Sequence, residues 1–167
     1  MFGLARKTIL VFFETFFIIS FIETLKFISN EYLLSFQKSI SKVGNDPRKK
    51  IIGIIKNDFS KKICTREKIA VWFTFFSEIK YKPAYHQICK ERDLYYQSVT
   101  ENIFFDLIKK EKVKLSEKNI ARGFQALIMG LWLDQLEDPD TFNRTQSKKI
   151  CFEFIKSNFP KQFKNEL

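Results

Sequence analysis

Residues 116–140, SEKNIARGFQALIMGLWLDQLEDPD, decide the fold that the sequence predicts. Ser116 can cap the first turn of a helix, and the segment that contains Pro139 can end it. Between these positions apolar residues recur every three or four places, which is the spacing of one helix face. They are Ile120, Phe124, Leu127, Ile128, Leu131 and Trp132. The stretch therefore predicts an amphipathic helix over about 116–136.

The rest of the chain shows the same helical period. Gly44 and Pro47 predict the end of a helix that starts near Phe16, and Pro83 suits the first turn of a long helix. With five Gly and four Pro among 167 residues, and no alternating apolar pattern of useful length, no strand is predicted. We expect one all-α fold of about six helices, the other five at about 16–43, 48–59, 66–80, 83–112 and 141–159. The helix over 66–80 is apolar on nearly every side, so we expect it to be the central one.

The chain is strongly basic, with a net charge of +10. Between Arg48 and Lys68, eight Lys and Arg residues face only Asp58 and Glu67. A charge of this size attracts polyanions such as nucleic acid or anionic lipid, but it also serves solubility. Composition alone leaves both explanations open.

The cysteines and the apolar segments indicate a cytoplasmic protein. Cys64, Cys89 and Cys151 are an odd number at wide spacing, which is unlike a disulfide framework or a CxxC pair. The apolar run over 8–22 is shorter than the roughly 20 residues that a membrane span needs, and Glu14 interrupts it. We therefore expect buried free cysteines and no membrane anchor.

Signatures of catalysis are absent from the sequence. It contains no GxSxG, P-loop, GxGxxG or HExxH motif and a single histidine. Most carboxylates, such as Glu91 and Glu101, lie among Lys and Arg at helical spacing, which is typical of a solvated helix face. Asp134 differs because it follows an apolar run, and a helix end that reaches the surface would also explain its position. We expect neither an enzyme nor a cofactor or metal site.

Aromatic residues are the most distinctive chemistry, with Phe alone at 20 positions. For any single ring, packing in the core is the better explanation. As a set, rings on converging helices can also line a cavity for an apolar or cationic ligand. Our candidate ligand-binding residues are Trp72, Phe76, Tyr96 and Trp132.

Four blocks, taken in order, resemble the C-terminal domain of BetI-type repressors of the TetR family. They are KIAVWFTFFSE at 68–78, Pro83, CKERDLYY at 89–96 and GFQALIMGLWL at 123–133. The resemblance covers about 23–160 and implies a helical fold that binds a small effector. For BetI-type members it implies that this effector is choline or another quaternary ammonium compound, and that the regulator controls glycine-betaine synthesis.

The resemblance also implies a homodimer in which the last two helices of each subunit form a four-helix bundle. Apolar residues of these helices offer more surface than we expect one core to bury. The interface that we predict consists of Phe124, Leu127, Ile128, Leu131, Phe154 and Ile155.

The start of the chain resembles only part of the family's helix-turn-helix. Residues 3–13, GLARKTILVFF, resemble its recognition helix, and the candidate DNA contacts are Arg6, Lys7, Thr8 and Phe12. The two helices that precede this one in the family have no counterpart here, and Phe12 replaces the usual Tyr. We thus expect a remnant of a DNA-binding domain at 1–22 and a ligand-binding and dimerisation domain at 23–167. We also expect weak or absent DNA binding, because a recognition helix needs the other two helices to hold it against the DNA.

Two alternative functions remain open at this point. A dimer surface without DNA contacts would suit a decoy that pairs with an intact paralogue. An apolar segment at 8–22 beside a basic surface would suit a membrane-associated helical protein.

Overall fold

A computed structural model describes residues 2–78 and 83–164, and their side chains over 19–78 and 87–164. This part of the chain forms six helices and no strand. The helices are α1 (Phe2–Ser41), α2 (Pro47–Asp58), α3 (Arg66–Glu78), α4 (Pro83–Glu111), α5 (Glu117–Glu137) and α6 (Arg144–Asn158). The predicted all-α fold is confirmed, and the bounds of α2 to α6 lie within a few residues of those expected.

Side chains cap the helices where the sequence indicated. Ser116 accepts a hydrogen bond from the backbone N of Asn119 at the start of α5, and Thr65 accepts one from Lys68 before α3. Asp46 caps α2 in the same way. After α1 the chain turns through Gly44, which has a φ of +67°, a conformation that glycine adopts without strain.

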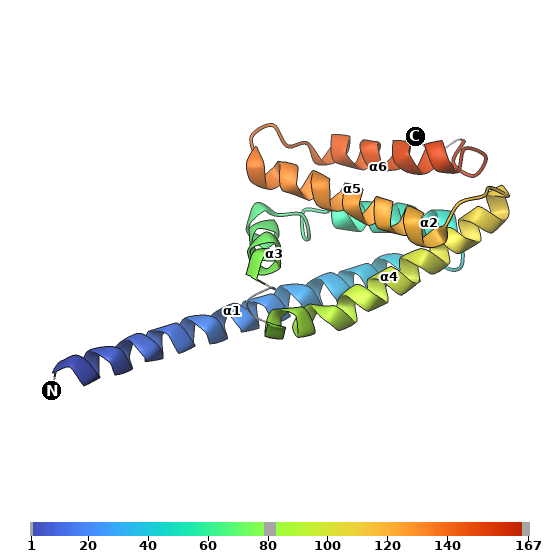
Figure 1. Ribbon diagram of the computed structural model, residues 1–167. Coiled ribbons are helices and arrows are strands. Elements are labelled where there is room, and N and C mark those ends of the chain that lie inside the picture. The colour runs from blue at the N-terminus through green and yellow to red at the C-terminus, as the bar shows by residue number, and fades with distance from the viewer. Residues whose placement is uncertain (1, 79–82, 165–167) are drawn as a thin grey trace.

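Helix α1 is longer than predicted. We expected a helix from about Phe16 and a separate recognition helix over 3–13, whereas one unbroken helix of 40 residues includes both. The reason is local, since no Gly or Pro lies between Gly3 and Gly44. At 1.5 Å per residue the helix is ~60 Å long, and its N-terminal half extends beyond the other helices (Figure 1). The side chains of the predicted DNA contacts, Arg6, Lys7, Thr8 and Phe12, lie outside the described residues.

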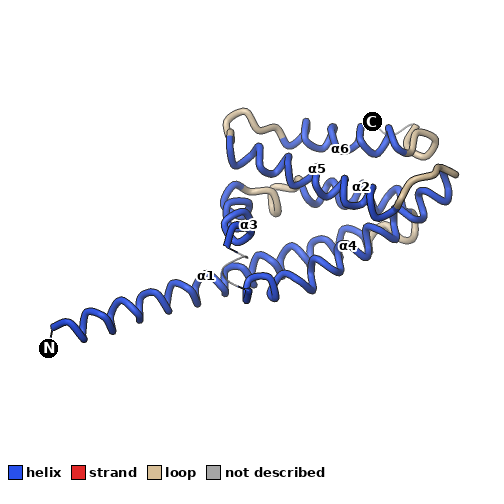
Figure 2. The backbone as a smooth tube through the Cα atoms, in the orientation of Figure 1, coloured by secondary structure: helices blue, strands red, loops and turns tan. Residues whose placement is uncertain are grey.

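Helix α2 occupies the centre of the fold. It contacts α1, α4 and α6, while α5 and α6 lie side by side along one edge (Figure 1). Its Ile51, Ile54 and Ile55 are fully buried. The expectation that α3 is central was wrong: α3 contacts α1 and α5 and lies at one end of the molecule, where a loop joins it to α2 (Figure 2). The apolar faces of α3 pack against α1 and α5 and line part of a cavity.

The core is rich in aromatic rings. Phe36, Phe59, Phe104, Phe124 and Phe159 are among its largest fully buried side chains. The rings of Phe104 and Phe124 meet edge to face with centroids 5.6 Å apart, which is a favourable geometry. All three cysteines are buried and free, as predicted. Within the described residues, no helix is long and apolar enough to span a membrane.

The predicted interface residues are mostly used by the core of a single chain. Phe124, Ile128, Leu131 and Ile155 are buried within it. Only Leu127 and Phe154 stay partly exposed, and the Phe154 ring stacks on that of Phe124 at 6.5 Å. The apolar surplus that motivated the predicted interface is therefore smaller than expected, and the dimer stays a prediction.

Close contact between α1 and α2 gives a test of the packing. A Cβ at Gly53 would lie 2.8 Å from the backbone oxygen of Ser39, whereas a Cβ at Gly130 in α5 would have no atom within 4 Å. Gly53→Ala should lower the free energy of unfolding by about 1–3 kcal/mol, because α1 has to move. Gly130→Ala should raise it by about 0.5–1 kcal/mol. Urea unfolding followed by circular dichroism measures both, and equal stabilities of the two variants would contradict the close approach.

Candidate ligand-binding pocket

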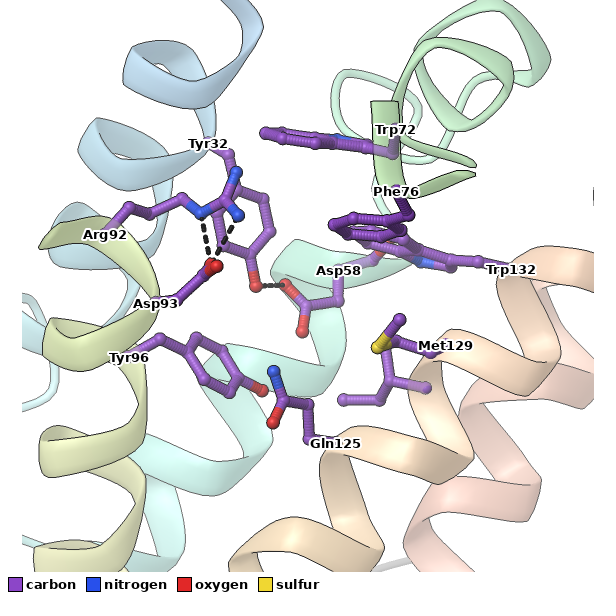
Figure 3. Close-up of a pocket in the computed structure, with 11 residues that line it drawn as sticks. Tyr32, Asp58, Trp72, Phe76, Arg92, Asp93, Tyr96, Gln125, Met129 and Trp132 are labelled. Carbon is purple, nitrogen blue, oxygen red and sulfur yellow. Dashed lines mark hydrogen bonds and ion pairs between the residues drawn. The ribbon is translucent and has the colours of Figure 1, made fainter. Parts of the chain in front are cut away.

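Five helices converge on a cavity with a volume of about 60 Å³. Roughly 10–15 Å³ suffices for one water, so the cavity has room for a small ligand and not for a large one. We call this cavity the ring pocket, and Figure 3 shows the residues that line it. The lining residues are Tyr32 of α1, Asp58 of α2, Trp72 and Phe76 of α3, Arg92, Asp93 and Tyr96 of α4, and Gln125, Ile128, Met129 and Trp132 of α5.

The structure brings together all four predicted ligand-binding residues. Trp72 and Phe76 are one turn apart on α3, and their rings stack with centroids 6.2 Å apart. Tyr96 and Trp132 approach from α4 and α5, on opposite sides of the pocket (Figure 3). Tyr32, which the sequence analysis did not select, lies between them, with its ring 6.3 Å from that of Tyr96 and 6.1 Å from that of Trp132. Aromatic rings therefore form much of the wall, in two groups: Tyr96, Tyr32 and Trp132, and the pair Trp72 and Phe76.

Asp58 is the most unusual group in the ring pocket. It is the last residue of α2 and is fully buried. The hydroxyl of Tyr32 and the amide Nδ2 of Asn57 both donate to Oδ1, each at 3.1 Å. The indole Nε1 of Trp132 donates to the backbone oxygen of Asp58 at 3.0 Å. The other carboxylate oxygen, Oδ2, has no hydrogen-bond partner among the described residues.

The sequence analysis missed this carboxylate. In the sequence, Asp58 is one of two acidic residues in a basic stretch, and nothing local distinguishes it from a solvated counter-charge. Asp134, the carboxylate that stood out by its apolar neighbours, is exposed and lies outside the ring pocket. A usable signal was the apolar period of α2, which places Asp58 three and four residues after the buried Ile55 and Ile54.

Burial controls the protonation of Asp58. Desolvation raises its pKa from 3.8 to about 7, against the opposing effect of the hydrogen bonds from Asn57 and Tyr32. Desolvation also raises the pKa of the Tyr32 and Tyr96 hydroxyls, and the nearby Asp58 adds to that effect. Both tyrosines are therefore neutral donors, whereas Asp58 changes charge near neutral pH.

Arg92 is the one cation in the pocket wall as the structure describes it. Its guanidinium carbon lies 4.2 Å from the ring centroid of Trp72, which is a cation–π contact. Its Nε donates to Asp93 at 2.8 Å, and Nη1 donates to Ser29 at 3.3 Å. Asp93 thus neutralises Arg92 locally. When Asp58 is ionised, the ring pocket carries one uncompensated negative charge, which suits a small cation.

The raised pKa of Asp58 predicts how stability depends on pH. An aspartate in an unfolded chain has a pKa near 3.9, whereas the pKa of Asp58 in the folded chain is about 7. The protonated form is favoured by folding, so stability is complete below pH 4 and falls as the pH rises to about 7. Asp58→Asn removes this loss of stability. The free energy of unfolding of the variant, relative to that of the wild type, should rise by roughly 4 kcal/mol between pH 4 and pH 8. Urea titrations at several pH values test this.

Asp134→Asn is the matched control because it changes an exposed carboxylate on α5. Its difference from the wild type should stay within about 0.5 kcal/mol at every pH. A wild type whose stability follows that of Asp58→Asn across the whole range would contradict the buried titration.

Comparison with known proteins identifies the fold. A solved structure described as a transcriptional regulator from Pseudomonas aeruginosa PAO1 superposes with a TM-score of 0.76 and 16% identity, over 84% of this chain and 68% of that one. At this identity the likeness concerns the fold alone. It shows that the helices around the ring pocket follow an arrangement already seen in a regulator.

Sequence comparison finds curated relatives that are transcriptional regulators. The HTH-type transcriptional regulator BetI of Pectobacterium carotovorum subsp. carotovorum (strain PC1) is 25% identical over 118 residues, which are 70% of this chain and 57% of the relative. Its counterpart from Proteus mirabilis (strain HI4320) is 27% identical over 110 residues, 66% of this chain and 53% of the relative. The chain thus spans about half the length of the curated relatives it matches.

Residues 47–160 match the family described as the C-terminal domain of BetI-type transcriptional repressors. This match includes every helix that lines the ring pocket except α1. It covers more than half of the chain. The chain therefore belongs to the family of BetI-type transcriptional repressor C-terminal domains, and the curated relatives it matches are transcriptional regulators.

Proposed function

We propose that the chain is the effector-sensing and dimerising body of a transcriptional regulator, and that the effector is a small cation such as choline or another quaternary ammonium compound. The observation that carries this proposal is the convergence of five aromatic rings from four helices on one small cavity. A quaternary ammonium group cannot donate a hydrogen bond from nitrogen, so ring faces and a negative charge have to hold it.

The lengths of the helices suggest how an effector could act on DNA binding. Tyr32 lines the ring pocket from α1, and the same helix continues without a break to residues 3–13, the segment that resembles a recognition helix. A ligand that changes the distance between α1 and α5 would tilt the far end of α1. Ligand binding can shift such an equilibrium only by its difference in affinity for the two positions. DNA binding by this segment stays part of the proposal.

The effector is tested by calorimetric titration with choline and its uncharged isostere 3,3-dimethylbutanol. We expect choline to bind more tightly, because a desolvated cation over a ring gains about 2 kcal/mol. Phe76→Leu should weaken choline binding at least about tenfold. Phe105→Leu, at an exposed position of α4 outside the ring pocket, is the control and should bind choline as the wild type does. Equal affinity for the charged and uncharged compounds would rule out an aromatic cage.

Dimerisation through α5 and α6 is tested by sedimentation. We expect the unmodified chain to be a homodimer, and Leu127→Glu with Phe154→Glu to yield a folded monomer, because these side chains are the partly exposed members of the predicted interface. A charge at the buried Leu131 or Ile155 would instead unfold the subunit. Leu94→Glu, at an exposed position of α4, is the control that should stay dimeric. A monodisperse unmodified monomer would overturn this part of the proposal.

A further inference from the structure

The free oxygen of Asp58 restricts the chemistry of the ligand beyond its charge. We infer that Oδ2 of Asp58 accepts a hydrogen bond from the bound ligand, so that the ring pocket selects cations that carry an O–H or N–H donor. This inference rests on the proposed function, because it concerns the effector of the same pocket. It divides small cations into two classes that the aromatic rings alone would not distinguish.

The two oxygens of Asp58 differ in their surroundings. Oδ1 accepts from Tyr32 and from Asn57, so both nearby donors are directed to the same oxygen. Oδ2 is buried and has no partner among the described residues. Figure 3 shows it pointing away from the Tyr32 hydroxyl, toward the side of the pocket where Tyr96 and Gln125 lie. A buried acceptor without a donor is unfavourable, and a ligand that supplies the donor removes that penalty.

The charges around Asp58 favour a cation over an anion. From α4, Arg92 is paired with Asp93 and rests on Trp72, so its charge is already compensated. The other titratable groups near Asp58 are Tyr32 of α1, Tyr96 of α4 and Cys151 of α6, with Cys64 before α3, and burial raises the pKa of each. These four groups are neutral at physiological pH. An ionised Asp58 therefore faces no free positive charge in the described part of the pocket.

The inferred contact predicts that the pocket distinguishes choline from similar cations without a donor. Choline has a hydroxyl group that can donate to Oδ2 while its trimethylammonium group contacts the rings. Propyltrimethylammonium has the same charge and nearly the same shape, but a methyl group replaces the hydroxyl. A carboxylate-bearing zwitterion would bring a second negative charge toward Asp58 and should be excluded. The ligand class is thus a compact cation with one O–H or N–H donor that can reach Oδ2.

The experiment is calorimetric titration of the full chain with three cations at pH 8 and pH 5.5. They are choline, propyltrimethylammonium and N,N-dimethylpropylammonium, which carries its donor on nitrogen. For the wild type at pH 8 we expect choline and N,N-dimethylpropylammonium, which both carry a donor, to bind at least about tenfold more tightly than propyltrimethylammonium. This is the usual effect of a hydrogen bond to a charged group. At pH 5.5, where Asp58 is protonated, we expect choline to bind about tenfold or more weakly than at pH 8.

Asp58→Asn keeps the shape of the side chain and removes its charge, and it should be at least as stable as the wild type at pH 8. In this variant we expect the preference for donors and the pH dependence both to disappear. Asp134→Asn, which removes an exposed charge outside the pocket, should keep both. This control separates a local hydrogen bond from a change in the overall charge of the protein.

The remaining outcomes distinguish the inference from the proposal beneath it. If choline and propyltrimethylammonium bind equally well to the wild type, the aromatic cage stands and the donor inference is wrong, with water as the partner of Oδ2. If only N,N-dimethylpropylammonium binds, and needs Asp58, the inference stands and the quaternary effector is wrong. If none of the three cations binds at either pH, both are overturned.

Discussion

Two hydrogen bonds to one residue join three helices at the centre of this protein. Tyr32 of α1 donates to the carboxylate of Asp58, and Trp132 of α5 donates to its backbone oxygen. Because Asp58 ends α2, these bonds set the distance from α2 to the helices on either side of it. The ring pocket is the space left between them, and its shape depends on both bonds. A change in the position of α1 therefore has to change the pocket as well.

Asp58 also destabilises the folded protein when it is ionised. A fully buried carboxylate with one free oxygen destabilises the ionised state, which is why its pKa lies near neutrality. An apolar residue of similar size would pack there without that cost. Groups that weaken a fold in this way are often found where a ligand binds, because the ligand supplies the missing interaction. This relation links the stability of the empty protein to the affinity of its pocket.

Close packing and open surface are divided unevenly over the molecule. At Gly53 the backbones of α1 and α2 approach so closely that a methyl group would collide with Ser39. On the outer side of α1, by contrast, Phe27 and Leu34 are largely exposed, and the N-terminal half of the helix leaves the body altogether (Figure 1). A helix that is packed at one end and projects from the body at the other can carry a small displacement from the pocket over a long distance.

Much of the architecture followed from local sequence. Helical periods, caps such as Ser116 and stops such as Gly44 predicted six helices, because these signals act within a few residues of one another. The four rings chosen for the pocket were also accessible to sequence reasoning, since periodicity places each on the inner face of its helix. Where α1 begins was misjudged, because a weak resemblance was preferred to the absence of any helix breaker after Gly3.

Only the tertiary structure decided which charged group enters the pocket. The apolar period of α2 places Asp58 on the inner side of its helix, but its partners lie 26 and 74 residues away in the sequence, so no local pattern could show which side chains enclose its carboxylate. For the same reason the sequence overestimated the apolar surface left for a second subunit: Phe124 and Ile155 are covered by packing between helices that are distant in the chain. Periodicity identifies the face of a helix that avoids water, but the partner that covers this face depends on how the helices pack.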